Sequence, residues 1–263
     1  MLAVFGCGSS NVDDLPCLLC GELEELASGG GYSNPSAPVS SSSIAPSSSS
    51  AVPSSSSLAP SSSSLAGFSG TYGSLVYSGQ TYRTVRIGEQ VWFADNLNYN
   101  ASGSKCYGDL DSNCEIYGRL YDWSTAMGFE SSCNSNYCSS QIQSKHRGIC
   151  PSGWHIPSGD DWDVLMDYVG GYSVAGRKLK STSGWYNNGN GTDQYGFSAL
   201  PGGDGGSDGS FLNVGDYGNW WSANEREDYS DFAYIRYMLY DRDDAYWSYN
   251  YKSNLQSVRC VQD

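Results

Sequence analysis

Hydrophobic and polar residues alternate in several short stretches after about residue 70, and a period of two is typical of β-strands with one buried face. Residues 82–97 predict a hairpin that turns at Gly88 and Glu89. Alternating, aromatic-rich stretches predict four more strands nearer the end of the chain, at residues 219–225, 231–240, 245–252 and 256–263.

Two stretches have helical spacing instead. Leu120, Trp123 and Met127 predict a short amphipathic helix within residues 118–127. A second helix is predicted from Ser158 onwards, where Ser-Gly-Asp-Asp matches a capping box, and two glycines end it. Its apolar face consists of residues spaced three or four apart, namely Trp162, Leu165, Met166 and Val169.

Together these elements predict an α+β fold with two short helices, long loops and a mainly antiparallel sheet. The loops are the glycine- and asparagine-rich stretches that follow residue 180. The folded domain is expected at residues 68–263, because the residues before it include too few large apolar side chains to form a core.

The chain before this domain has a repetitive composition. Residues 40–67 repeat a seven-residue unit four times, each with four serines and three of them with a proline. Proline excludes a continuous helix, so we expect a disordered, Ser-rich linker. Residues 8–39 are expected to be a disordered N-terminal segment.

The first residues, MLAVFGCGSS, resemble a bacterial lipobox. They predict that residues 1–7 are the remnant of a lipoprotein signal and that Cys7 is lipidated. The alternative is an unstructured terminus with a free thiol. No other run approaches the ~20 apolar residues of a membrane-spanning helix, so membrane contact is expected only through a lipid anchor at Cys7.

Composition narrows the class of protein. The formal net charge of -14 argues against a nucleic-acid partner, because nucleic-acid binding requires a basic face. The 21 tyrosines and eight tryptophans, beside only 14 lysines and arginines, are typical of an extracellular β-rich module. Six of the nine cysteines lie in the predicted domain without a CxxC pair there, which favours disulfides over a zinc site.

The stretch CPSGWHIPSGDDWDVL, residues 150–165, combines the residue types of a hydrolase active site. Ser158, however, caps the predicted helix, and Asp160 and Asp161 lie in its first turn, where the helix dipole favours anions. Cys150 is expected to form a disulfide, and His155 lies in an extended run. We therefore expect no catalytic residue here, with catalysis as the alternative.

Seven sequence blocks, among them VRIGEQVWFADNLNY, CPSGWHIPSGDDWDVL and VRCVQD, occur in the order found in the Fibrobacter succinogenes major paralogous domain. The chain resembles this family over residues 71–263. That domain is in turn similar to the superfamily of C-type lectin-like domains and formylglycine-generating enzymes. The resemblance implies a C-type lectin-like fold.

The same resemblance implies how the cysteines pair. Six cysteines allow 15 pairings, of which the resemblance favours Cys150–Cys260, Cys106–Cys114 and Cys133–Cys138. The sugar-binding tripeptides of calcium-dependent lectins, Glu-Pro-Asn, Gln-Pro-Asp and Trp-Asn-Asp, do not occur here. The reactive cysteine pair of the formylglycine-generating enzymes is also missing. Neither calcium-dependent lectin activity nor that oxidase chemistry is therefore expected.

One stretch is a candidate for a metal. Asp109, Asp111 and Asn113 alternate as the first ligands of a calcium loop do, although Cys114 replaces the glycine that such a loop needs. The alternative is a solvated acidic turn. We expect no cofactor, and calcium is the one candidate ion.

Candidate ligand-binding residues are aromatic. Trp247, Tyr249 and Tyr251 alternate, so they share one face if residues 245–252 form a strand, where their rings either stack on a ligand or pack in the sheet core. Long loops carry specificity in lectin-like folds, which adds a second set, Trp185, Tyr186, Asn187 and Asn188.

These observations predict a surface-anchored, disulfide-stabilised binding module at the outer membrane or cell surface. Its expected partner is a polysaccharide or a surface protein. The alternatives are an extracellular enzyme of unknown reaction and a structural paralogue within the cell envelope.

Overall fold

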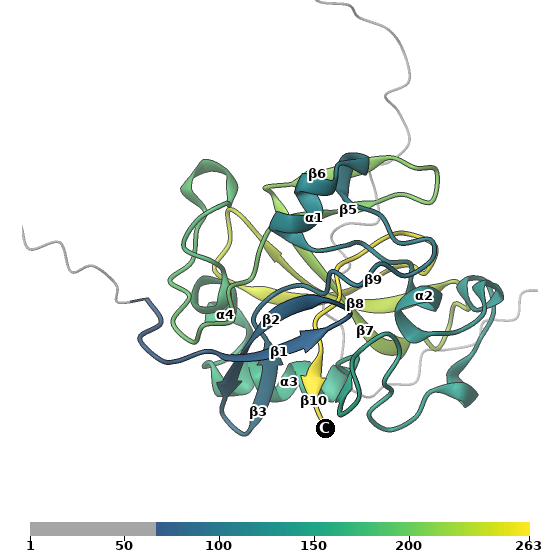
Figure 1. The fold of residues 1–263 in the computed structure, drawn as a ribbon, viewed down its shortest axis with the longest axis horizontal. Coiled ribbons are helices and arrows are strands. Elements are labelled where there is room, and N and C mark those ends of the chain that lie inside the picture. Colours follow the sequence, from purple (N-terminus) through teal and green to yellow (C-terminus); the bar gives the residue numbers. More distant parts are fainter. Residues whose placement is uncertain (1–66) are drawn as a thin grey trace, which may run out of the picture. The chain divides into compact units, whose positions relative to one another are not determined.

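A computed structural model of the protein describes residues 67–263. The predicted lipidation at Cys7, the segment at residues 8–39 and the linker up to residue 66 lie outside the described residues. The described part has the predicted α+β composition, with short helices, long loops and two sheets that are mostly antiparallel (Figure 1).

The first sheet is entirely antiparallel and begins with the predicted hairpin. Arg86 pairs with Val91 and Ile87 with Gln90 across a turn in which Gly88 has a φ of 61°, a conformation that glycine adopts without strain. The sheet order is β1-β2-β3-β10-β4. The strands are β1 (Gly73–Tyr77), β2 (Gln80–Ile87), β3 (Gln90–Phe93), β4 (Trp154–His155) and β10 (Val261–Gln262).

The second sheet has the order β6-β5-β7-β8-β9, and its one parallel pair is β5 with β7. Its strands are β5 (Gly202–Gly205), β6 (Phe211–Val214), β7 (Tyr217–Glu225), β8 (Phe232–Leu239) and β9 (Ala245–Tyr251). The predicted strands at residues 219–225, 231–240 and 245–252 are thus confirmed. Residues 256–263 are regular only at β10, and the glycine-rich stretch predicted as a loop forms β5 and β6.

Four α-helices are present in the described residues, where the sequence predicted two. They are α1 (Asp111–Tyr117), α2 (Trp123–Met127), α3 (Gly159–Tyr168) and α4 (Tyr172–Leu179). Single 3-10 turns add η1 (Tyr107–Asp109), η2 (Ser131–Asn134), η3 (Ser139–Gln141) and η4 (Tyr186–Asn188).

The start of α2 corrects the helix predicted for residues 118–127. The Asp122 carboxylate accepts a hydrogen bond from the Thr125 N–H at 2.9 Å, so the helix begins only after Asp122. Leu120 and Tyr121 before it are extended and pair with Lys105 and Gln256. Tertiary pairing therefore overrides the helical spacing of these residues.

Two hydrophobic core clusters meet at β7. Trp220 packs in the cluster that contains Trp92 and Trp162, whereas Trp221 packs in the cluster that contains Trp123. Neighbouring residues of a strand point to opposite faces of the sheet, so β7 separates the two clusters. The helices α3 and α4 cover part of the Trp220 face, with α3 against β7 and α4 against β9.

All three expected disulfides are present. Cys106 is bonded to Cys114 and Cys133 to Cys138, and each pair closes a short local loop. Cys150 is bonded to Cys260 across 110 residues of sequence and joins the segments that lead into β4 and β10. The two local bonds constrain only their own loops, whereas the third constrains most of the domain.

Replacing Cys150 and Cys260 together by serine is expected to lower the free energy of unfolding by about 4–5 kcal/mol, because the lost bond no longer restricts a long loop of the unfolded chain. The same change at Cys133 and Cys138 opens a short loop and should cost only about 2 kcal/mol. Urea denaturation of the full chain measures both values. Equal losses would contradict the dominant role of the long bridge.

Candidate functional site

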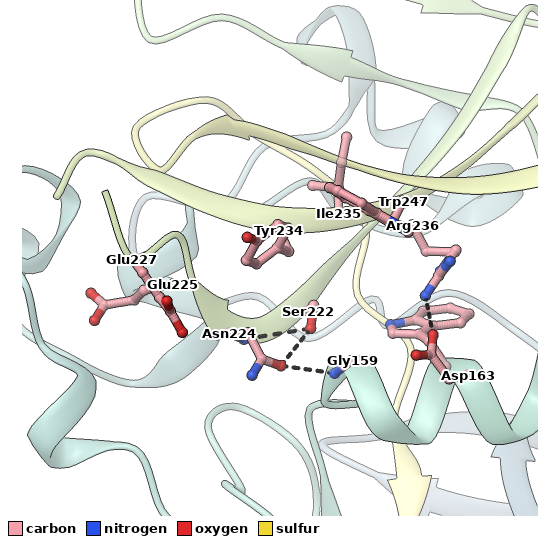
Figure 2. Close-up of a pocket in the computed structure, with 11 residues that line it drawn as sticks. Gly159, Asp163, Ser222, Asn224, Glu225, Glu227, Tyr234, Ile235, Arg236 and Trp247 are labelled. Carbon is pink, nitrogen blue, oxygen red and sulfur yellow. Dashed lines mark hydrogen bonds and ion pairs between the residues drawn. The ribbon is translucent and has the colours of Figure 1, made fainter. Parts of the chain in front are cut away.

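A cleft of about 310 Å³ lies between the start of α3 and the face of the β7-β8-β9 sheet (Figure 2). Figure 2 shows Arg236 reaching from β8 to Asp163 on α3 at one end of the cleft, with Glu225 and Glu227 at the other. The remaining lining residues come from α3 and the three strands and are Gly159, Trp162, Ser222, Asn224, Tyr234, Ile235 and Trp247.

The start of α3 is attached directly to β7. The predicted capping box is present, with Ser158 and Asp161 as its two members. The free N–H of Gly159 donates to Asn224 Oδ1 at 2.8 Å, and the Ser222 hydroxyl donates to the same oxygen at 3.1 Å. These bonds satisfy an N–H that the helix itself leaves unpaired and fix the bottom of the cleft.

The upper wall of the cleft belongs to an aromatic face on β8 and β9. The register places Tyr234 opposite Tyr249 and Phe232 opposite Tyr251, so these side chains share a face. Trp247 lies on the same face and contacts Tyr234 with ring centroids 5.6 Å apart. The Trp247 side chain is 55% exposed, so it is a surface residue and not part of the sheet core.

Hydrogen-bond donors without acceptors lie at the α3 end of the cleft. Arg236 is only 3% exposed, and its Nη2 donates to Asp163 Oδ1 at 2.9 Å. The Tyr172 hydroxyl donates to the same oxygen at 2.6 Å, and burial together with this carboxylate raises the pKa of Tyr172. Arg236 Nε and Nη1 and Trp162 Nε1 have no partner within the described structure. These three nitrogens have almost no accessible surface, so their unpaired N–H groups are a local cost of the fold.

A second pocket of about 760 Å³ lies next to the cleft. Asn224, Glu225 and Glu227 line both hollows and therefore form the ridge between them. The far wall of the second pocket comes from residues 137–144, a segment that starts inside the loop closed by the Cys133–Cys138 disulfide, and includes Tyr137, Ser139, Ile142 and Ser144.

A buried ion pair holds the ridge in place. Lys252 has no exposed surface, and its ammonium group donates to the Glu225 carboxylate and to the carbonyl oxygens of Cys133, Asn136 and Ser230. Glu225 also accepts a hydrogen bond from the Cys138 N–H at 2.9 Å. The end of β7 and the wall of the second pocket are thus bonded to the same charged group.

The polar residues of the stretch 150–165 are engaged in structure. His155 is buried and lies between two carboxylates, with Nδ1 at 2.8 Å from Asp263 Oδ1 and Nε2 at 3.4 Å from Asp161 Oδ2. Burial alone would lower the pKa of His155, but the two carboxylates outweigh it and the pKa is raised. The Ser158 hydroxyl donates to Asp161 and not to the histidine, so no nucleophile is activated here.

The loop candidates for ligand binding lie outside the cleft. Trp185 corrects the prediction: it is 4% exposed, and its indole N–H donates to Ser181 Oγ at 3.1 Å and to the Ala199 carbonyl at 3.0 Å, so it is a core residue. Tyr186, Asn187 and Asn188 form the exposed turn η4, and Tyr186 packs against Tyr240.

The calcium candidates make local contacts. Asp109 forms an ion pair with Lys105 at 3.1 Å, and the Asn113 amide donates to the Tyr107 carbonyl at 2.8 Å. Asp111 lies in the first turn of α1. Across residues 67–263, no group of three or more His, Cys, Asp or Glu side chains is arranged to hold a metal ion.

Sequence reasoning missed Arg236, Asp163 and Tyr234. A single arginine within the alternating aromatic strand at residues 231–240 is a usable signal, because an arginine between buried positions requires a partner. The identity of that partner could not be inferred, since Asp163 is 73 residues away.

Within the described part of the chain, no helix is both long and apolar enough to span a membrane.

The fold and site define a disulfide-linked α+β domain with an aromatic cleft at its surface. The model of the Fibrobacter succinogenes major domain matches residues 85–262, and the chain therefore belongs to this family. Searches of the curated proteins and of the solved structures found no match.

The charged His155 is expected to stabilise the fold at low pH. Because its pKa in the fold is raised, this stabilisation is fully present below the ordinary value of about 6.5 and is lost as the pH rises through the raised pKa. The destabilisation caused by His155→Gln should therefore be largest near pH ~6 and shrink towards pH ~8. Urea denaturation across this range measures it, and a difference independent of pH would refute the assignment.

Removing Lys252 is expected to destabilise the domain strongly. Lys252→Met leaves the Glu225 carboxylate buried without a partner and should lower the free energy of unfolding by about 3–5 kcal/mol. The double variant Lys252→Met with Glu225→Gln carries neither charge and should recover part of this loss. Lys145→Met, at an exposed position, is the control, and an equal effect there would contradict the prediction.

Proposed function

We propose that this protein is a surface-anchored, disulfide-stabilised binding module with a C-type lectin-like fold, and that its cleft binds polysaccharide. One observation carries the proposal: Trp247, whose side chain is 55% exposed, lines the same cleft as the polar side chains of Asn224 and Glu227. Binding sites for small hydroxylic molecules combine an apolar wall with a few fixed polar groups in this way.

The groups around the cleft complement a sugar ring. The flat face of the exposed Trp247 ring offers a stacking surface for the apolar face of a pyranose, and the Tyr234 ring stands at 74° to it. Asn224 and Glu227 offer amide and carboxylate groups to its hydroxyls. A protein partner would need a larger apolar contact, which makes polysaccharide the better candidate.

The cleft supports binding better than hydrolysis. Glycoside hydrolysis generally needs two carboxyl groups, one acting as an acid and one as a base or nucleophile. Of the three carboxylates that line the cleft, Asp163 is paired with Arg236 and Glu225 with the buried Lys252. This leaves Glu227 as the one lining carboxylate without an ion pair within the described structure, so the enzyme alternative is the weaker one.

The predicted features before the domain support the same function. A lipid on Cys7 would anchor the chain, and the Ser-rich repeats at residues 40–67 would separate the domain from the membrane. A binding module at the end of a flexible tether can reach a polymer that lies outside the cell surface.

Trp247→Ala is expected to weaken glycan binding at least about tenfold, because stacking aromatic residues dominate such contacts. Tyr246→Ala is the matched control: Tyr246 is the adjacent residue of β9, is 40% exposed and points to the opposite face. A glycan array with the full chain identifies ligands, and calorimetric titration compares the variants. If the wild type binds no glycan, or both variants bind alike, the proposal is wrong.

A further inference from the structure

The cleft and the second pocket are neighbours that share three lining residues. Asn224, Glu225 and Glu227 line the two hollows, with volumes of about 310 and 760 Å³ on either side. Either volume lies within the range of ~300–1,000 Å³ that is usual for sites holding a whole small ligand. The two together offer more room than one sugar unit at the end of a glycan needs.

Building on the proposed function, we propose that the two hollows form one groove. We infer that its ligand is the interior of a linear, uncharged polysaccharide and not a terminal sugar. The chain would cross the ridge at Asn224 and Glu227, with some units in the cleft and others in the second pocket.

Arg226 makes the surface continuous between the aromatic face and the second pocket. Its guanidinium lies 3.8 Å from the ring centroid of Tyr249 and 4.6 Å from that of Tyr229, and the same residue lines the second pocket. The aromatic face thus runs from Trp247 through Tyr249, whose ring is covered by the Arg226 guanidinium, to the second pocket. A surface that is continuous over this length suits successive units of a polymer better than a single bound sugar.

The far wall of the groove is fixed in position. The Tyr137 hydroxyl donates to the Glu227 carbonyl at 2.8 Å, which connects this wall directly to the ridge. Lys252 holds the backbone of Cys133 and Asn136 in the same segment. A groove with bonded walls needs little ordering when a ligand binds, so less affinity is lost to that cost.

The charges of the groove favour an uncharged ligand. Five carboxylates line the two hollows, namely Asp160, Asp161, Asp163, Glu225 and Glu227. Three cations line them as well, namely Lys145, Arg226 and Arg236, so the lining is negative on balance. Carboxylates accept hydrogen bonds from hydroxyl groups and repel uronate or sulfate groups. The net charge of -14 on the whole chain acts in the same direction.

The test titrates the full chain with ladders of gluco-, manno- and xylo-oligosaccharides from the disaccharide to the octasaccharide, and with an oligogalacturonide ladder as the charged arm. Affinity for one uncharged ladder should rise with length and then level off once both hollows are filled. The charged ladder should bind more weakly at every length.

The variant Ser144→Trp tests the second pocket alone, because Ser144 is an exposed residue that lines this pocket and not the cleft. The variant should bind the long uncharged oligosaccharide at least about tenfold more weakly and the disaccharide unchanged. Ser74→Trp, at an exposed position of β1 outside the groove, is the matched control and should bind like the wild type.

The outcomes distinguish the two proposals. If glycans bind but affinity does not depend on length, or Ser144→Trp binds like Ser74→Trp, the single groove is wrong while the cleft keeps its proposed function. Tighter binding of the oligogalacturonides overturns the uncharged ligand. If no oligosaccharide of any ladder binds, or if only a protein partner binds at Trp247, the proposed function is wrong. The groove proposal is then wrong as well.

Discussion

The buried guanidinium of Arg259 connects the two sheets from inside the protein. Its Nε donates to Asn96 Oδ1 at 2.8 Å, and its other nitrogens donate to the carbonyl oxygens of Phe197 and Ser198. The Trp220 indole donates to the same Asn96 oxygen at 2.9 Å. Burial lowers the pKa of Arg259 to about 9, so the group is still charged at neutral pH. Because a buried charge without partners costs several kcal/mol, these segments have to fold around it together.

The strand β7 is held by one buried cation near its middle and by another at its C-terminal end. Arg259 fixes Trp220 through Asn96, and Lys252 fixes Glu225. Between these two points the pairing of β7 with β8 is irregular, since the register shifts between Trp221 and Glu225. The irregular residues include Ser222 and Asn224, which line the cleft. A stretch of strand without regular pairing exposes its side chains and backbone polar groups. In β7 the buried cations Arg259 and Lys252, on either side of the irregular stretch, keep its backbone in one conformation.

Elements with strong local signals could be predicted from the sequence, and elements that depend on distant partners could not. The capping box of Ser158 and Asp161 specifies the start of α3, so this helix was found correctly. The helix α4 was missed because Gly176 interrupts its pattern, although the glycine is needed where the Asp244 carbonyl approaches too closely for a Cβ atom. Alternation placed Trp247, Tyr249 and Tyr251 on one face. Trp185 was chosen as a ligand-binding candidate because it lies in a loop, and a loop position does not reveal that its side chain is buried. The contact of Arg236 with Asp163 joins two segments whose proximity exists only in the fold.

The cleft lies where one face of the second sheet changes from core to surface. Met238 and Ala245 pair on the face that α3 and α4 cover, and both are fully buried. The next pair on the same face is Arg236 with Trp247, and from this pair onwards the face is exposed to solvent. Trp247 can therefore be substituted without creating a cavity in the core. Arg236 lies at the boundary between the buried and the exposed part of the face and belongs to both. Under the proposed function, relatives that keep the core would acquire different ligands by substitutions on the open part of the face alone, because affinity depends on few side chains.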